Sequence, residues 1–380
     1  MKKRKICLNT LLFISVIIPI ITYGTVIAEG YQDFNEIMRP LFQSNVNIRN
    51  PIGGCSSFCL SNPISCVFGT NCDYFLFTSG QLFVNKRNMV KKTWETGTTG
   101  KHAEWTSKFG SLTFNLVGYQ MASEGMNEAG LIISTMTLSE TKMPTPDERP
   151  SLNSGFWVQY QLDNYATVEE VLESDTIVRI TDTEKCHYLV CDKKGHCAVI
   201  EFLDGKMVYH TGQNLPVNVL TNSIYEESVQ AWRENKLYGD SLPRFALAAD
   251  EIGIKYKFAN NNATIYYAFY ILSLVSRPYT IWSIAFDNHD MQVYFISQRN
   301  QQMRRIIFEK LDFSSKTPVQ MLDIHAPLAG DISNCLLPYS HQASLDHLIS
   351  SFSVFGPGVP HDEIEDLLEY FEGFPFVESD

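Results

Sequence analysis

Short runs of apolar and β-branched residues, separated by clusters of Gly, Asn and Asp, dominate the chain after residue 55. This pattern is typical of antiparallel strands joined by tight turns. It predicts strands at Ile64–Phe68, Gln81–Asn85, Leu112–Leu116, Gly130–Met136, Tyr188–Cys191, Ala198–Phe202, Val217–Thr221 and Gln292–Ile296.

Two or three helices interrupt the strands. Phe156–Asp163 has a helical pattern and leads into a second helix at Thr167, where Glu170 three residues later completes a capping-box signature. Phe245–Gly253 and Tyr266–Val275 are further candidates. Strand-rich halves with helices between them predict an α+β fold of two packed antiparallel sheets with outer helices. No Pro/Gly/Ser-rich linker divides residues 55–360, so we expect one domain there.

The N-terminus has the layout of a secretory signal peptide. Basic residues at Met1–Lys5 precede an apolar stretch over about 11–21, and Val26–Ala28 offers a cleavage site after residue 28. Pro19 and Thr22 break the apolar run, which is too short for a stable membrane anchor of about 20 residues. We expect residues 1–28 to be removed from a secreted or periplasmic protein; an uncleaved anchor is the alternative.

The segments that precede and follow the domain differ in their residue patterns. Residues 29–54 show little periodicity and end in a turn-like Pro51 and two glycines, which fits either a loose N-terminal arm or a propeptide. Residues 361–380 hold eight acidic residues and no Lys or Arg, with Ile364, Leu367, Leu368 and Phe371 at helical spacing. They predict a surface amphipathic helix, with a partner-binding tail as the alternative.

Composition supports a folded, globular protein. Of the 380 residues, 44% are hydrophobic and only 19% charged, which argues against disorder. The net charge of −12 disfavours binding to nucleic acid, which needs basic patches.

The nine cysteines do not form an obvious scaffold, because a chain of this length needs no disulfides to fold. An even number left after loss of Cys7 still permits them. The segment Cys186–Cys197 resembles a metal site at first sight. Its two β-rich runs around Asp192–Gly195 instead predict a hairpin, and zinc sites usually have tandem cysteine pairs. We expect no metal.

Candidate chemistry begins at Gly53-Gly54-Cys55. Gly54 offers an unhindered carbonyl on a flexible backbone, so the Cys55 sulfur can attack it and shift the peptide to a thioester. Hydrolysis would leave Cys55 as a free N-terminus, whose α-amine, with a pKa of about 7.7–8.0, is a base on the nucleophile's own residue. A papain-type Cys–His pair is the alternative, but no histidine, His102 and His210 included, has surroundings that mark a general base.

Five motifs in order carry a resemblance to a known family: Gly53–Leu60, Phe68–Asp73, Gly125–Leu131, Val219–Ser223 and Ser241–Phe245. They resemble the choloylglycine hydrolase family, which contains bile salt hydrolases and penicillin V acylases and looks related to acid ceramidase-type amidases. The likeness runs from about residue 55 to 322. It implies the N-terminal-nucleophile hydrolase fold, a four-layer αββα sandwich, and a reaction that needs no metal or cofactor.

The resemblance also implies roles for single residues. It places the nucleophile at Cys55 rather than Cys59, which lies four residues too far along and lacks a preceding glycine. Asp73 matches the carboxylate that holds the amine, Asn222 the amide that donates to the oxyanion, and Arg244 a buried arginine that supports the nucleophile. Taken singly, each has an ordinary explanation, as a turn residue, a strand cap or a surface arginine.

Two departures concern the substrate. Thr70 stands where bile salt hydrolases usually carry Arg, and Thr137 aligns with a substrate-binding position that is Asn or Tyr in well-known members. The implied activity is hydrolysis of the linear amide of a small N-acyl compound, with conjugated bile salts, penicillin V and N-acyl homoserine lactones all open. A catalytically silent exported binding protein of the same fold is the second hypothesis. The family is often oligomeric, so a homo-oligomer is also open.

Overall fold

The structure is a computed structural model that describes residues 54–61, 66–74, 79–93, 101–181, 185–254, 261–353 and 360–377. The predicted signal peptide, and all of the predicted arm or propeptide except Gly54, lie outside the described residues.

The first sheet has seven strands in the order β14-β1-β2-β15-β16-β17-β19. Its strands are β1 (Ser56–Ser61), β2 (Cys66–Asp73), β14 (Val219–Leu220), β15 (Thr280–Asp287), β16 (Gln292–Ser297), β17 (Asn300–Ile307) and β19 (Gly330–Asp331). All neighbours are antiparallel except β17 and β19. The N-terminal strand β1 therefore lies between a partner close in sequence and one that is more than 150 residues away.

The second sheet has nine antiparallel strands in the order β13-β12-β11-β8-β7-β6-β3-β18-β20. They are β3 (Gln81–Asn85), β6 (Ser111–Asn115), β7 (Glu124–Asn127), β8 (Ile132–Thr137), β11 (Cys186–Cys191), β12 (Cys197–Leu203), β13 (Lys206–Thr211), β18 (Gln320–Asp323) and β20 (Leu337–Pro338). Two small ribbons pair β4 (Val90–Lys92) with β5 (Glu104–Thr106) and β9 (Ser151–Asn153) with β10 (Arg179–Thr181).

Aromatic side chains fill the space between the two sheets. Phe114 of β6 meets Phe295 edge-on, with ring centroids 5.2 Å apart, and Phe286 at 6.1 Å. Trp282 of β15 lies 6.3 Å from the same ring. Edge-to-face pairs of this kind contribute beyond the area that they bury, so the sheets are joined by a packed aromatic layer.

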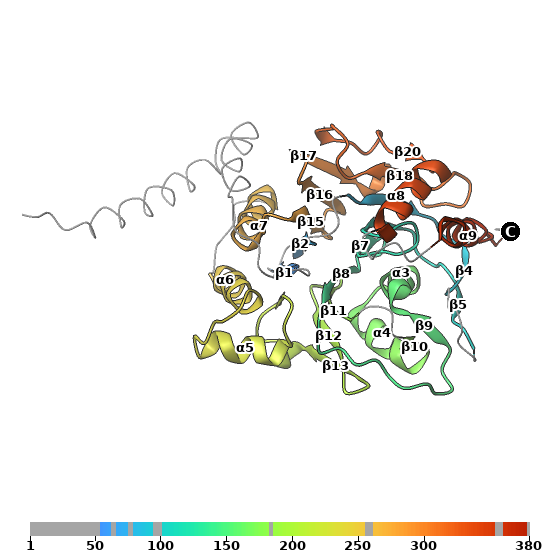
Figure 1. Ribbon diagram of the computed structural model, residues 1–380. Coiled ribbons are helices and arrows are strands. Elements are labelled where there is room, and N and C mark those ends of the chain that lie inside the picture. Colours follow the sequence, from blue (N-terminus) through green and yellow to red (C-terminus); the bar gives the residue numbers. More distant parts are fainter. Residues whose placement is uncertain are drawn as a thin grey trace, which may run out of the picture. The chain divides into compact units, whose positions relative to one another are not determined.

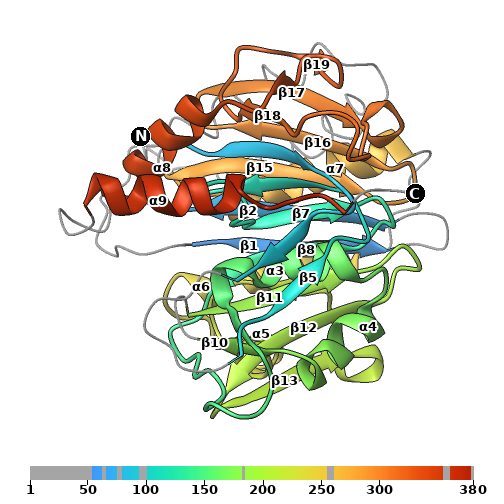
Figure 2. The ribbon, with the colours of Figure 1, turned by 90° about the vertical axis from the view of Figure 1, so that its right-hand side faces the viewer.

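Helices cover both outer faces. They are α3 (Ser154–Asn164), α4 (Val168–Glu173), α5 (Tyr225–Arg233), α6 (Ser241–Gly253), α7 (Asn261–Val275), α8 (His341–Ser353) and α9 (His361–Glu372). Figure 1 shows α6 and α7 on one side of the strands and α3 and α9 on the other, and Figure 2 shows α8 and α9 lying side by side across the strands. The arrangement is the predicted αββα sandwich. None of the helices in the described ranges is long and apolar enough to cross a membrane.

Most predicted elements are present within a few residues. The strand at Gln81–Asn85 has the predicted bounds, whereas Ile64, the first residue predicted for β2, lies outside the described residues. The capping box is present: the Thr167 hydroxyl accepts from the Glu170 N–H, and the Glu170 carboxylate accepts from the Thr167 N–H.

The expected number of helices was too low. The described residues contain seven α-helices, and α8 shows why two or three were expected: its buried face includes Ser344, His347 and Ser351 beside Leu348. Such a face carries little hydrophobic periodicity. In α9 the prediction of an amphipathic helix is confirmed, because Ile364, a neighbour of the acidic residues, is buried in the core.

Candidate active site

Cys55 directly precedes β1 of the first sheet, and its side chain is buried. The Gly54 N–H donates to the Asp73 carbonyl oxygen at 2.8 Å, which continues the β1–β2 ladder past its last named pair, Ser56 and Asn71. The Cys55 Sγ lies 3.9 Å from the same carbonyl oxygen. The peptide bond between Gly54 and Cys55 is thus held in a defined, extended conformation.

Arg244, on α6, ties three parts of the site together. Its Nη1 donates to the Cys55 carbonyl oxygen (2.6 Å) and to the Ser56 hydroxyl (2.7 Å), and its Nη2 donates to Asn222 Oδ1 (2.8 Å). Its Nε pairs with Asp240 at 3.0 Å. The side chain is 1% exposed, so the explanation as a surface arginine is wrong. The planar guanidinium fixes the Cys55 backbone and the Asn222 amide in one geometry.

Asp73 ends β2 on the same face of the sheet as Gly54 and is fully buried. Its Oδ1 accepts from the Thr280 hydroxyl at 2.5 Å, whereas its Oδ2 has no hydrogen-bond partner among the described residues. Burial raises the pKa of Asp73 from 3.8 to about 7, although the positive charge of Arg244 opposes the rise. The Oδ2 atom of Asp73 therefore lacks a hydrogen-bond donor among the described residues.

Asn222 follows β14, the strand beside β1, and reaches across to the other sheet. Its Nδ2 donates to both the carbonyl oxygen and the hydroxyl of Thr137, at the end of β8, with 3.0 Å in each case. The Ser241 hydroxyl accepts from its backbone N–H at 2.9 Å. The structure thus brings together all five residues predicted for the site: Cys55, Asp73, Thr137, Asn222 and Arg244.

A buried histidine behind Asn222 escaped the sequence analysis. His187 Nε2 lies 2.6 Å from the Thr221 carbonyl oxygen, and its Nδ1 lies 3.0 Å from Glu201 Oε1. Burial alone would raise the pKa of Glu201, but hydrogen bonds, first that from His187, hold it at about 2. His187 thus bridges the strand before Asn222 and the buried Glu201 carboxylate. The sequence marks it only as a polar residue in a buried strand.

Comparison with known proteins agrees with this geometry. Residues 55–236 match the linear amide C-N hydrolases of the choloylglycine hydrolase family. Over these residues, just under half of its length, the chain resembles the choloylglycine hydrolase family. It is thus a hydrolase of linear amide carbon–nitrogen bonds.

Two penicillin V acylases are among the similar proteins. The one from Pectobacterium atrosepticum is 26% identical over 58% of this chain and 72% of its own. The structure of the one from Agrobacterium tumefaciens has a TM-score of 0.66 at 27% identity, covering 75% of this chain and 98% of that one. A conjugated bile acid hydrolase from Clostridium perfringens shares the fold, with a TM-score of 0.58 at 18% identity over 70% of this chain and 96% of that one.

Thr70, the departure from bile salt hydrolases, is 1% exposed in the layer between the sheets. Its hydroxyl lies 2.9 Å from those of Ser57 and Ser134, which are 3.0 Å from each other. Three neutral hydroxyls satisfy one another there. The chain therefore has no cationic side chain at position 70, beside the strand that follows Cys55.

The cysteines divide into bonded and free thiols. Cys59, the rival nucleophile, is bonded to Cys66, which leaves it no thiol. Cys191 and Cys197 form a second disulfide across the β11–β12 hairpin, so the predicted hairpin is confirmed. Cys55 retains its free thiol.

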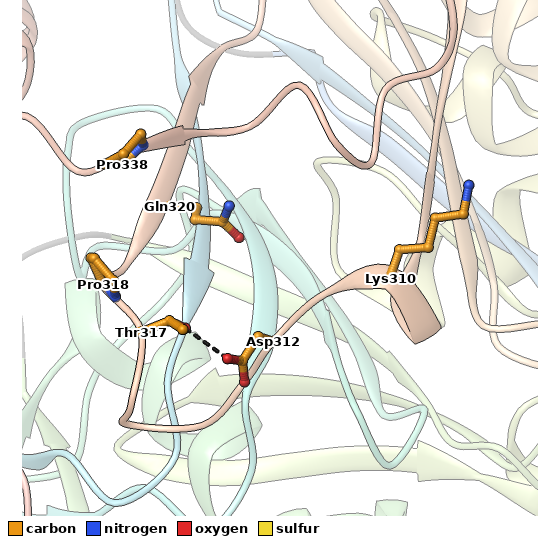
Figure 3. Close-up of a pocket in the computed structure, with 6 residues that line it drawn as sticks. All are labelled: Lys310, Asp312, Thr317, Pro318, Gln320 and Pro338. Carbon is orange, nitrogen blue, oxygen red and sulfur yellow. Dashed lines mark hydrogen bonds between the residues drawn. The ribbon is translucent and has the colours of Figure 1, made fainter.

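A hollow of about 210 Å³ lies elsewhere on the molecule, and Figure 3 shows the residues that line it. They are Lys310, Asp312, Thr317, Pro318, Gln320 and Pro338. Its two charged side chains are already engaged, Asp312 with Thr317 (2.9 Å) and Lys310 with Asp331 (2.6 Å). None of the five site residues lines this hollow.

Proposed function

We propose that this chain is an exported N-acyl amide hydrolase of the penicillin V acylase type, with Cys55 as an N-terminal nucleophile. In this proposal, removal of residues 1–54 frees the Cys55 α-amine. The amide carbon–nitrogen bond of the substrate is then cleaved through an acyl-thioester on Cys55, without metal or cofactor.

The buried Asp73 carboxylate carries the proposal. Its Oδ2 has no hydrogen-bond partner among the described residues, and a methyl group added to Gly54 would lie only 3.4 Å from its Cβ. Gly54 therefore occupies the space beside this carboxylate. Once Gly54 is cut away, the α-amino group of Cys55 takes that space, supplies the missing donor to Oδ2, and adds a positive charge when it takes up the thiol proton. A buried carboxylate oxygen without a donor is otherwise costly to keep.

The catalytic steps follow from this arrangement. The amine accepts the proton of the Cys55 thiol as the sulfur attacks the acyl carbon of the substrate. The same ammonium then returns the proton to the leaving nitrogen, and the amine product departs. Water, activated by the amine, attacks the thioester and releases the acid. Asp73 orients the amine throughout, and Arg244 holds the Cys55 carbonyl oxygen.

Asn222 is the donor for the oxyanion. Both its amide hydrogens now point at Thr137, one to the carbonyl oxygen and one to the hydroxyl. The acyl oxygen of a substrate would replace the Thr137 hydroxyl as acceptor, which leaves the amide anchored by the carbonyl. Arg244 polarises the amide from its other end, through Oδ1, and this strengthens the N–H bond to a developing negative charge.

Two observations favour penicillin V over a conjugated bile salt as substrate. The relatives at 26% and 27% identity are penicillin V acylases. Thr70 also provides no positive charge where bile salt hydrolases usually carry Arg. Export is supported by the two disulfides, since such bonds persist in oxidising compartments outside the cytosol.

The test combines N-terminal sequencing and intact mass with turnover assays. Wild-type protein secreted by its host should begin at Cys55 and hydrolyse penicillin V faster than glycocholate or a long-chain N-acyl homoserine lactone. The Cys55→Ala variant should retain residues from about Glu29 and be inactive. Cys335→Ser, which changes an exposed free thiol outside the five site residues, is the cysteine control and should behave as wild type.

Either part of the proposal can fail alone. A wild-type protein that still begins near Glu29 keeps the α-amine locked in a peptide bond and refutes the N-terminal nucleophile. A correctly processed protein that hydrolyses none of the three substrates points to the silent binding protein instead.

A further inference from the structure

A second free thiol stands directly opposite Cys55. In the β1–β2 ladder Ser56 pairs with Asn71, and the Gly54 N–H donates to the Asp73 carbonyl oxygen at 2.8 Å. Residue 55 therefore faces Cys72, and because the pair formed by residues 54 and 73 is hydrogen-bonded, the next pair along is not. Side chains of non-hydrogen-bonded pairs approach most closely, with Cα atoms about 4.5 Å apart.

The same chain contains this arrangement in its oxidised form. Cys191 and Cys197 are opposite residues of β11 and β12, and the Asp192 N–H donates to the His196 carbonyl oxygen one pair further on. They too form a non-hydrogen-bonded pair, and their sulfurs are bonded, with Cα atoms 4.2 Å apart. The backbone register of the Cys55 pair is thus one that this protein already uses for a disulfide.

The surroundings separate the two thiols in reactivity. Cys72 is 5% exposed and contacts the side chain of Cys55. Burial raises the pKa of the Cys72 thiol well above its usual value, and the neighbouring Cys55 thiol raises it further. Cys72 therefore stays protonated and inert by itself, while Cys55, next to its own amine in the processed enzyme, is the thiol that an oxidant meets.

We propose that Cys55 and Cys72 form a reversible disulfide, which makes Cys72 the resolving cysteine of the nucleophile. This inference rests on the proposed role of Cys55 for its effect on activity, but formation of the bond itself does not. The oxidant is a peroxide, such as exported proteins meet outside the cell. The disulfide removes the nucleophile from catalysis and also shields it from irreversible oxidation.

The chemistry balances in two steps. The Cys55 thiol reduces hydrogen peroxide by two electrons, which gives a sulfenic acid on Cys55 and one water. The Cys72 sulfur then attacks the sulfenic sulfur; the S–O bond breaks, the S–S bond forms, and the departing hydroxide takes the Cys72 proton as a second water. A dithiol such as dithiothreitol reverses the bond by exchange. Without Cys72, a second peroxide carries Cys55 to the sulfinic acid, which dithiothreitol does not reduce.

The experiment exposes processed wild type, Cys72→Ser and Cys335→Ser to a graded series of hydrogen peroxide and then to dithiothreitol. Each sample is read by intact mass, by peptide mapping without reduction, and by hydrolysis of penicillin V. Wild type and Cys335→Ser should lose two hydrogens (about 2 Da) as a 55–72 linked peptide appears. Their activity should fall in step and return fully with dithiothreitol.

Cys72→Ser should instead gain oxygen at Cys55 and recover less than about a tenth of its activity after dithiothreitol. Sulfinic acid at Cys55 in wild type without any 55–72 peptide would overturn the proposal, as would full recovery of Cys72→Ser. The peptide map decides the matter even if the protein hydrolyses none of the substrates tried. If Cys72→Ser does not fold, Cys72→Ala replaces it, and the wild-type map still gives the answer.

Discussion

Asp73 should make the unprocessed protein less stable as the pH rises. Its pKa is about 7 in the folded chain and about 3.8 in the unfolded one, so between these values only the folded state holds the proton. Stability then falls by about 1.4 kcal/mol for each pH unit. From pH 5 to pH 8 the loss due to Asp73 is about 3 kcal/mol, which is a large share of the stability of a typical domain.

Asp73→Asn tests this directly, because the amide is nearly isosteric and does not titrate. The substitution is made in a Cys55→Ala background, which we expect to keep the propeptide attached and the α-amine absent, and the background protein is its reference. Urea unfolding at pH 5, 6, 7 and 8 gives the free energy of unfolding of each. The difference between the two proteins should shift by about 3 kcal/mol in favour of the Asp73→Asn variant over that range.

Burial, which is the largest cause, raises the pKa of Glu124 to about 8 in both proteins, so most of its slope cancels in the difference; only the part due to the Asp73 charge does not. Asp366→Asn, which changes an exposed carboxylate on α9, is the control and should leave the pH profile as it is. Parallel pH profiles for the Asp73→Asn variant and its reference would refute the reasoning. Parallel profiles would mean that Arg244 keeps Asp73 ionised, so that the carboxylate needs no ammonium beside it to carry its charge.

Three further predictions concern single contacts. Asn222→Ala removes the proposed oxyanion donor, so kcat for penicillin V should fall by about 10²–10³ with little change in KM. Steady-state kinetics measure both constants, and a change confined to KM would contradict this role. Lys91→Met leaves Asp163, its buried partner at 2.9 Å, without a cation. The free energy of unfolding in urea should fall by about 3–5 kcal/mol, and adding Asp163→Asn to the same protein should partly reverse the loss. Gly69→Ala puts a methyl 2.4 Å from the Phe58 ring and should cost about 1–3 kcal/mol in thermal unfolding, less in a Phe58→Leu background.

The amino-acid sequence alone determined the local elements of this protein and indicated the chemistry proposed for its site. The run Gln81–Asn85 has three apolar residues between two polar ones and becomes β3 with the predicted bounds, and the Thr167 capping box starts α4. Both depend on neighbours within a few residues, which a pattern records. The glycine before Cys55 and the ordered family motifs likewise pointed to the residue that we propose as the nucleophile.

The tertiary structure alone decided how these pieces meet. β2 pairs with β15, more than 200 residues later, and this register lets the Thr280 hydroxyl donate to the Asp73 carboxylate. Likewise the pairing of β1 with β2 sets Cys72 opposite Cys55, and the packing of α6 buries Arg244. Such contacts depend on strand register and burial across the whole chain. Contacts between residues that are distant in sequence cannot be predicted from a local pattern. Periodicity encodes only which face of an element is apolar.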